Sequence, residues 1–164
     1  METSTASDEL LFEATLASPA ATADLAANLA PLLRAGDVIG LEGELGTGKT
    51  TFARALIRTL GDSREEVPSP TFTLVQTYET DGMTVWHCDL YRIERPEDAV
   101  ELGLEEAWGS ALTLIEWPER LGRDLPPRRL ALRFEYGDDE TARRVTVMGG
   151  REWRRRLEGL FDDG

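Results

Sequence analysis

Cysteine, histidine and lysine each occur only once among the 164 residues of this chain. A single cysteine, Cys88, cannot form an internal disulfide, and nothing in the sequence resembles a zinc site of cysteines and histidines. The chain is nevertheless long enough to bury roughly 70% of its unfolded surface in one core. We therefore expect residues 9–160 to form a single domain and the polar residues 1–8 to be disordered.

Long apolar runs are also missing. No segment reaches the roughly twenty apolar residues that a membrane-spanning helix requires. The first residues, METSTASDELLFEA, lack the basic region of a secretory signal. Together with the low cysteine content, these absences exclude a membrane protein and favour a soluble protein of the reducing cytoplasm.

Positive charge is scarce as well. The formal net charge of −13 argues against unaided nucleic-acid binding, because that binding depends on basic residues that replace phosphate counterions. The charge is uneven, however, since residues 120–156 hold eleven arginines against six acidic residues. A basic patch around Arg143, Arg144 and residues 151–156 could face a nucleotide, an RNA or an acidic partner. Solvent-exposed arginines on a terminal helix are the simpler interpretation.

The single lysine, Lys49, belongs to GELGTGKT at residues 43–50, which is a complete G-x-x-x-x-G-K-[ST] phosphate loop. An apolar strand is predicted before it at 37–41, and apolar residues at helical spacing follow it as far as Gly61. The glycines let the backbone fold around an anion, and N–H groups at the start of the helix point at phosphate oxygens. Lys49 would reach the β and γ phosphates of a triphosphate, and the Thr50 hydroxyl would ligate Mg2+. The motif therefore predicts a nucleoside triphosphate site.

Phosphoryl transfer also needs Mg2+ held by an acidic residue at the end of another strand, and a further group that orients the attacking group. Two apolar segments end in such a residue: ALTLIE ends at Glu116, and TVWHCD ends at Asp89. Structural roles remain open for both, because Asp89 could cap the next turn and Glu116 could pair with an arginine.

Three further residues lie near these motifs. His87 precedes Asp89 by two positions, so both would face the same side of a strand, where His87 could orient the carboxylate or simply pack. Thr71, in SPTF at 69–72, lies where a threonine can sense a γ-phosphate, or else it marks an ordinary entry into a strand. Trp117 follows Glu116 and is expected to fill the core rather than to report on the site.

Strand-like and helical segments alternate along the chain. The predicted order is a strand at 10–16, a helix capped by Ser18, the phosphate loop and its helix, a hairpin over 71–91, a helical stretch from Pro96, a buried strand at 111–117, a second hairpin over 130–149 and a closing helix at 151–160. We expect an α/β domain of three layers with a P-loop NTPase fold, in which a largely parallel central sheet carries additional antiparallel strands.

Four segments in this order, GELGTGKTTF, SPTFTLVQTY, HCDLYR and LIEWPER, closely resemble the motifs of the TsaE (YjeE-type) family. The resemblance runs from about Thr22 to Arg144. Members of that family are small bacterial P-loop ATPases required for threonylcarbamoyladenosine modification of tRNA. The resemblance implies that the chain binds a complex of TsaB and TsaD, and meets tRNA only indirectly or through that complex. Binding and hydrolysis of ATP would support repeated threonylcarbamoyl transfer to adenosine 37 of tRNA, a transfer that the chain itself does not perform.

The resemblance also implies roles for individual residues. Thr50 and Glu116 correspond to the Mg2+ ligands, and Asp89, together with Lys49 and Glu116, corresponds to residues needed for hydrolysis. The implied ATP-binding residues are Thr22, Gly43, Leu45, Gly46, Thr47, Gly48, Lys49, Thr50, Thr51 and Arg144. The sequence departs from the family pattern at Thr47, where alanine is usual, and in TARRV at 141–145, which replaces a Gly-Arg pair. Arg143 and Arg144 are therefore both candidates for the late arginine.

Two other functions share the phosphate loop. A small-molecule kinase would contain it, but such an enzyme usually needs an arginine-bearing lid, and no long arginine-rich insertion interrupts the predicted core. A nucleotide-dependent interaction module with little turnover would also contain it. A GTPase is excluded, because guanine selection by Asn-Lys-x-Asp requires a second lysine.

Overall fold

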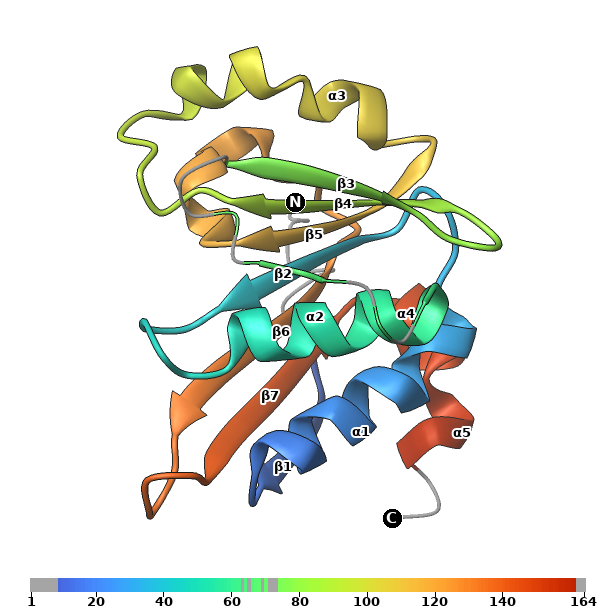
Figure 1. Cartoon of the computed structure of the whole chain (residues 1–164), viewed down its shortest axis with the longest axis vertical. Coiled ribbons are helices and arrows are strands. Elements are labelled where there is room, and N and C mark those ends of the chain that lie inside the picture. The colour runs from blue at the N-terminus through green and yellow to red at the C-terminus, as the bar shows by residue number, and fades with distance from the viewer. Residues whose placement is uncertain (1–8, 63, 65, 69, 71–73, 162–164) are drawn as a thin grey trace.

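The computed structural model describes residues 9–161 except 63, 65, 69 and 71–73 (Figure 1). The segment expected to be disordered, 1–8, and the candidate switch residue Thr71 lie outside the described residues. Within the described part of the chain, no helix is long and apolar enough to cross a membrane.

The described strands form one seven-stranded sheet in the order β1-β7-β6-β2-β5-β4-β3. Their bounds are Glu9–Leu16 (β1), Val38–Glu42 (β2), Val75–Glu79 (β3), Thr84–Asp89 (β4), Ala111–Glu116 (β5), Leu130–Tyr136 (β6) and Arg143–Gly149 (β7). Neighbours in the central group β6-β2-β5-β4 run parallel. The outer strands β3, β7 and β1 are added antiparallel. This arrangement confirms the predicted fold class, and β3–β4 and β6–β7 are the two predicted hairpins.

Two α-helices cover one face of the sheet. They are α1 (Pro19–Leu29) and α2 (Lys49–Leu60), which lie side by side in Figure 1. Ser18 begins α1 as predicted, because its side-chain oxygen accepts a hydrogen bond from the backbone N–H of Ala21 at 3.3 Å. Gly61 ends α2, also as predicted.

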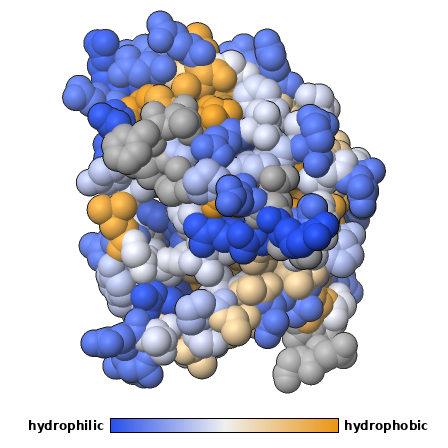
Figure 2. All heavy atoms as spheres, in the orientation of Figure 1, coloured by the Kyte–Doolittle hydropathy of each residue, from blue (hydrophilic) through white to orange (hydrophobic). Residues whose placement is uncertain are grey.

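The opposite face carries shorter and tighter turns. They are the 3-10 helices η3 (Pro96–Leu102) and η4 (Pro118–Asp124), with the short helix α3 (Leu104–Ala107) between them in sequence. A 3-10 helix, η2 (Ala30–Leu32), follows α1, while α4 (Arg151–Arg156) and α5 (Glu158–Phe161) come after the last strand. In the orientation of Figure 1, η3 and α3 lie above β3, and Figure 2 shows apolar surface in that upper region of an otherwise mostly hydrophilic face.

Two predicted helices differ from the structure. The stretch from Pro96 is a 3-10 helix that ends at Gly103, whose φ of 71° is left-handed and stops the helix before α3 begins. The closing helix over 151–160 is divided at Leu157, where the backbone leaves helical geometry with φ −96° and ψ 0°. Each prediction was right about position and wrong about continuity.

The core has two parts, one on each face of the sheet. The larger part lies beneath α1 and α2, where the rings of Phe52 and Phe134 meet with centroids 5.9 Å apart. The smaller part lies beneath the 3-10 helices and includes Cys88, Leu90 and Ile115. Burial on both faces fixes the parallel strands rigidly, so their carboxyl ends can hold side chains in defined positions.

Two arginines tie the C-terminal helices to the sheet. The guanidinium of Arg156 donates to both carboxylate oxygens of Asp37, at 2.9 and 2.6 Å, immediately before β2. Arg154 donates from Nε to Glu9 at the start of β1, at 2.8 Å. These ion pairs give part of the arginine-rich segment a structural role. The Arg156 side chain is only 9% exposed, so for this residue the interpretation as a solvent-exposed arginine is wrong.

Candidate functional site

The phosphate loop connects the carboxyl end of β2 to the start of α2. Gly43, Gly46 and Gly48 have φ angles of 139°, 79° and 113°, in the left-handed region that glycine tolerates. A Cβ atom at Gly43 would lie only 2.5 Å from the carbonyl oxygen of Phe134. The loop therefore needs glycine at this position for space as well as for conformation, and it opens α2 with backbone N–H groups that can face an anion.

A cleft of about 290 Å³ lies against the helix side of this loop. Its walls come from the start of α1, the loop, the ends of β4 and β5, and the β6–β7 turn. The structure brings together in it most of the predicted site residues: Thr22, Leu45, Gly46, Gly48, Lys49, Thr50, Thr51, Asp89 and Glu116. Gly43 and Thr47 instead line a neighbouring hollow beside β6.

Lys49 is almost fully buried, with 4% of its surface exposed. Its Nζ donates a hydrogen bond to the carbonyl oxygen of Gly43 and lies 3.7 Å from the centroid of the Trp117 ring. Burial lowers the pKa of Lys49, while the nearby carboxylates of Glu116 and Asp89 oppose that shift. The ammonium is thus held inside the cleft by a carbonyl and an aromatic face.

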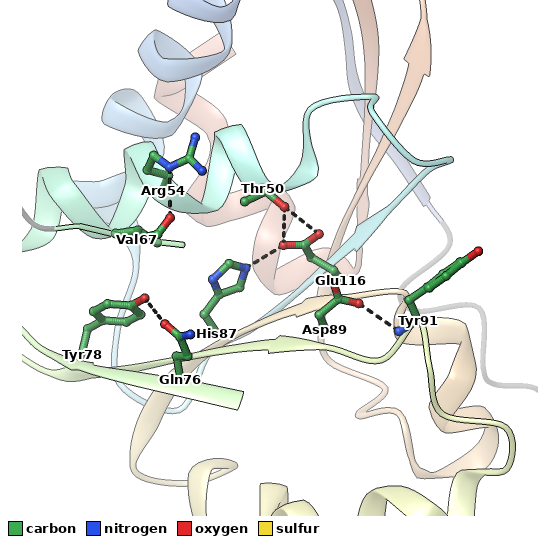
Figure 3. Close-up of polar contacts among 9 residues, drawn as sticks. All are labelled: Thr50, Arg54, Val67, Gln76, Tyr78, His87, Asp89, Tyr91 and Glu116. Carbon is green, nitrogen blue, oxygen red and sulfur yellow. Dashed lines mark hydrogen bonds and ion pairs between the residues drawn. The ribbon is translucent and has the colours of Figure 1, made fainter. Parts of the chain in front are cut away.

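Thr50, Glu116 and His87 form one connected polar group (Figure 3). The Thr50 Oγ1 atom lies 3.0 and 2.9 Å from the two carboxylate oxygens of Glu116. The Nε2 atom of His87 lies 2.7 Å from Oε2 of Glu116, and both side chains are buried, at 0% and 2% exposed. Among the described residues, Glu116 therefore bonds to a threonine and a histidine, and not to an arginine as its structural alternative would require.

Asp89 lies beside Glu116, because the two residues are register partners at the ends of the parallel strands β4 and β5. Its Oδ1 atom accepts a hydrogen bond from the backbone N–H of Tyr91 at 2.9 Å. Asp89 therefore does cap the turn that follows β4, and it also lines the cleft. The turn-capping contact therefore leaves Asp89 at the cleft, and its role in hydrolysis stays a prediction.

Trp117 was expected to fill the core, but its contacts at the site were not predicted from the sequence. Its ring packs against the smaller core, but it also contacts Lys49 and forms part of the cleft wall. The backbone of Trp117 is left-handed, with φ 61° and ψ 50°, which costs roughly 1–2 kcal/mol for a residue with a side chain. Its ring also meets Tyr91 with centroids 5.0 Å apart. The only sequence signal was its position directly after the acidic end of a strand.

The structure separates the two late arginines. Arg143 lines the cleft, and its Nη2 atom donates to the carbonyl oxygen of Gly46 at 3.2 Å. Arg144 is exposed, and it is not among the residues that line the cleft. Thr141, the first residue of TARRV, also lines the cleft, and so do Pro19 and Glu140, which no motif singled out.

The oxygen atoms at the start of α2 suit a hard divalent cation. Among the described residues, no group of three or more histidine, cysteine or acidic side chains could hold a metal by itself. Thr50 and Glu116 nevertheless bring a hydroxyl and a carboxylate together at the phosphate loop. Mg2+ commonly takes one or two protein oxygens and completes its shell with phosphates and water, so this pair fits Mg2+ bound with a nucleotide.

Comparisons with known proteins agree on one family. A family model described as "Threonylcarbamoyl adenosine biosynthesis protein TsaE" matches residues 16–145. Two proteins named "tRNA threonylcarbamoyladenosine biosynthesis protein TsaE" are similar over most of their length. The one from Rickettsia bellii is 42% identical over 119 residues, which cover 73% of this chain and 83% of that protein. The one from Bacillus subtilis is 38% identical over 136 residues, which cover 82% and 84%.

The fold agrees with a solved structure as well. The crystal structure of Bacillus subtilis YdiB matches this chain with a TM-score of 0.76 and 30% sequence identity. The match covers 91% of this chain and 93% of that chain.

Proposed function

Because the chain belongs to the TsaE family, we propose that it binds and hydrolyses Mg-ATP in support of tRNA threonylcarbamoylation by TsaB and TsaD. The modification is made at adenosine 37, and the chain reaches tRNA only through that complex. A cytoplasmic location follows from this role. The observation that carries the proposal is the meeting of Thr50 and Glu116 at the phosphate loop, because a loop that only bound anions would not need a buried carboxylate there.

Binding begins with the phosphate loop. Backbone N–H groups of residues 46–50 cradle the phosphates, and the dipole of α2 favours their negative charge. Lys49 exchanges its hydrogen bond with the Gly43 carbonyl for the β and γ phosphate oxygens. Thr22 and Arg143 lie in the cleft walls at the start of α1 and of β7, where they contact the rest of the nucleotide.

Hydrolysis depends on the two carboxylates. Thr50 and Glu116 would hold Mg2+, which would supply positive charge to neutralise the β and γ phosphates. Asp89, beside Glu116 in the register of β4 and β5, orients the attacking water and accepts a hydrogen bond from it. The cleft residues Lys49 and Arg143 add positive charge around the phosphates as charge develops during transfer.

The decisive experiment combines the purified chain with TsaB, TsaD, ATP and the remaining substrates, and counts modified tRNA molecules per complex. We expect many rounds with the wild-type chain and at most a single round without it. Glu116→Ala should bind ATP in the absence of Mg2+ as the wild type does, yet fail to support repeated rounds. An equal number of modified tRNA molecules per complex with and without the chain would contradict the proposed function.

The same experiment separates the two alternatives. Phosphate transferred from ATP to a metabolite, with no effect on tRNA, would support a small-molecule kinase. Full support of modification by the Glu116→Ala chain would support an interaction module that needs ATP binding but not its hydrolysis.

A further inference from the structure

We propose that His87 is a positioning residue that orients the Glu116 carboxylate for its metal. This inference rests on the proposed function, because it concerns the metal site that the function requires. His87 lies on β4 and Glu116 on the neighbouring parallel strand β5, so the contact joins two strands across the sheet beneath the phosphate loop (Figure 3). Its role is to hold a ligand, and it does not touch the nucleotide.

The contact is short and fully enclosed. His87 is 0% exposed and Glu116 is 2% exposed, and 2.7 Å separates Nε2 from Oε2. Carboxylate ligands of metal ions are commonly fixed by hydrogen bonds from an outer group, and loss of such a group typically weakens metal binding about 10- to 100-fold. The His87 contact has the geometry of such a group.

The hydrogen bond runs from His87 to Glu116. The other ring nitrogen, Nδ1, is buried and has no hydrogen-bond partner among the described residues. A carboxylate can only accept, so the proton of the imidazole lies on Nε2 and points at Oε2. An N–H group at Nδ1 would leave a buried donor without a partner, which is the costlier arrangement.

Glu116 is thereby held from two sides. The Thr50 hydroxyl approaches both carboxylate oxygens, whereas His87 engages Oε2 alone. The histidine thus fixes the rotation of the carboxylate about its last bond while both oxygens stay near Thr50 at the start of α2. A histidine that merely filled space would need no polar partner at this distance.

Four variants of the full chain test this role: His87→Gln, His87→Asn, His87→Leu and Glu116→Ala. The amide nitrogen of glutamine lies about as far along the side chain as Nε2, whereas that of asparagine lies near the Nδ1 position. Glutamine and asparagine thus place similar polarity in the same buried site, but only glutamine can reach Glu116. Mn2+, which replaces Mg2+ as a paramagnetic probe, is titrated by electron paramagnetic resonance with a non-hydrolysable ATP analogue bound.

We expect His87→Asn and His87→Leu to weaken Mn2+ binding about tenfold or more, and His87→Gln to stay within about threefold of the wild type. Binding of the ATP analogue without metal should be unchanged in all three. Thr113→Val, a buried polar change on the neighbouring strand β5, is the matched control and should leave Mn2+ binding unaltered.

Equal Mn2+ affinity of His87→Gln and His87→Asn, whether both are normal or both are weakened, would overturn the positioning role. Glu116→Ala keeps this result separate from the proposed function. If wild-type and Glu116→Ala chains bind Mn2+ equally, the metal site itself is wrong, and the positioning role is rejected with it. If Glu116→Ala alone loses Mn2+, the site stands and His87 only packs.

Discussion

At the scale of single residues, Lys49 explains why a chain with seventeen arginines retains one lysine. Its ammonium fits a pocket formed by the Gly43 carbonyl and the face of Trp117. A guanidinium is planar and broad, and it cannot occupy that space and approach phosphates as a compact charge. The shape of the site therefore favours lysine over arginine at position 49.

We predict that Lys49→Ala weakens ATP binding at least about tenfold, since a hydrogen bond to a charged group contributes about 1.5–3 kcal/mol. Lys49→Arg should not restore it. Isothermal titration calorimetry of all three chains measures this, with thermal unfolding as the check on folding. Wild-type affinity in Lys49→Ala would show that the ammonium does not face the phosphates.

A second prediction concerns the ring of Trp117. A cation over an aromatic face contributes about 0.5–2 kcal/mol, so loss of the ring in Trp117→Leu should weaken ATP binding several-fold. Trp117→Phe keeps an aromatic face and should lose less. Titrations of both variants decide between this role and simple packing, because packing alone gives no reason for leucine and phenylalanine to differ in nucleotide affinity.

The sequence predicted which residues lie at the site more completely than it predicted the contacts that these residues make. Lys49 and Thr50 are fixed within one motif, and Glu116 and Asp89 meet because parallel strands bring their carboxyl ends to one edge. Arg143 and Arg144 could not be separated, because neighbouring residues of a strand face opposite sides and the two are chemically identical. The roles of these residues in catalysis remain predictions.

At the scale of elements, the phosphate loop shows how backbone shape limits the sequence. We predict that Gly43→Ala destabilises the protein by about 1–3 kcal/mol, because the new Cβ meets the Phe134 carbonyl in a strained conformation. Gly82→Ala, in the turn between β3 and β4, is the control, since its Cβ would meet nothing within 4 Å. Urea unfolding measures both, and equal stabilities would contradict this account of the loop.

The two helices with clear end signals, α1 and α2, were predicted from the sequence. The 3-10 geometry of the segment after Pro96 was not. Ser18 and Gly61 mark helix ends through local hydrogen bonds and backbone freedom, which sequence alone conveys. The stretch after Pro96 has helical spacing of apolar residues, but its turns are of the 3-10 type and it stops at Gly103. This segment, η3, packs against η4, and the local sequence does not predict a contact between segments so far apart along the chain.

At the scale of the whole molecule, the ion pair between Asp37 and Arg156 joins residues 119 positions apart, with side chains only 14% and 9% exposed. Without the Asp37 charge, the nearly buried Arg156 keeps a long 3.9 Å contact to Glu152 and its hydrogen bond to the Leu32 carbonyl. We therefore predict that Asp37→Asn lowers the free energy of unfolding by about 3 kcal/mol. Urea unfolding tests this, with the exposed Arg155→Ala as control. ATP affinity should not change, because Asp37 precedes β2 and the phosphate loop follows it.

The pairing of β1 with β7 places the first described strand beside the last one, with Glu9 opposite Gly149. A ribosome makes β1 early and β7 late, so β1 must wait for a partner while nearly all of the intervening chain is synthesised. The parallel strands that carry the phosphate loop and Glu116 can assemble before that moment. The pairing of β1 with β7 is therefore a late step in the folding of each molecule. The phosphate loop and Glu116 can come together before it.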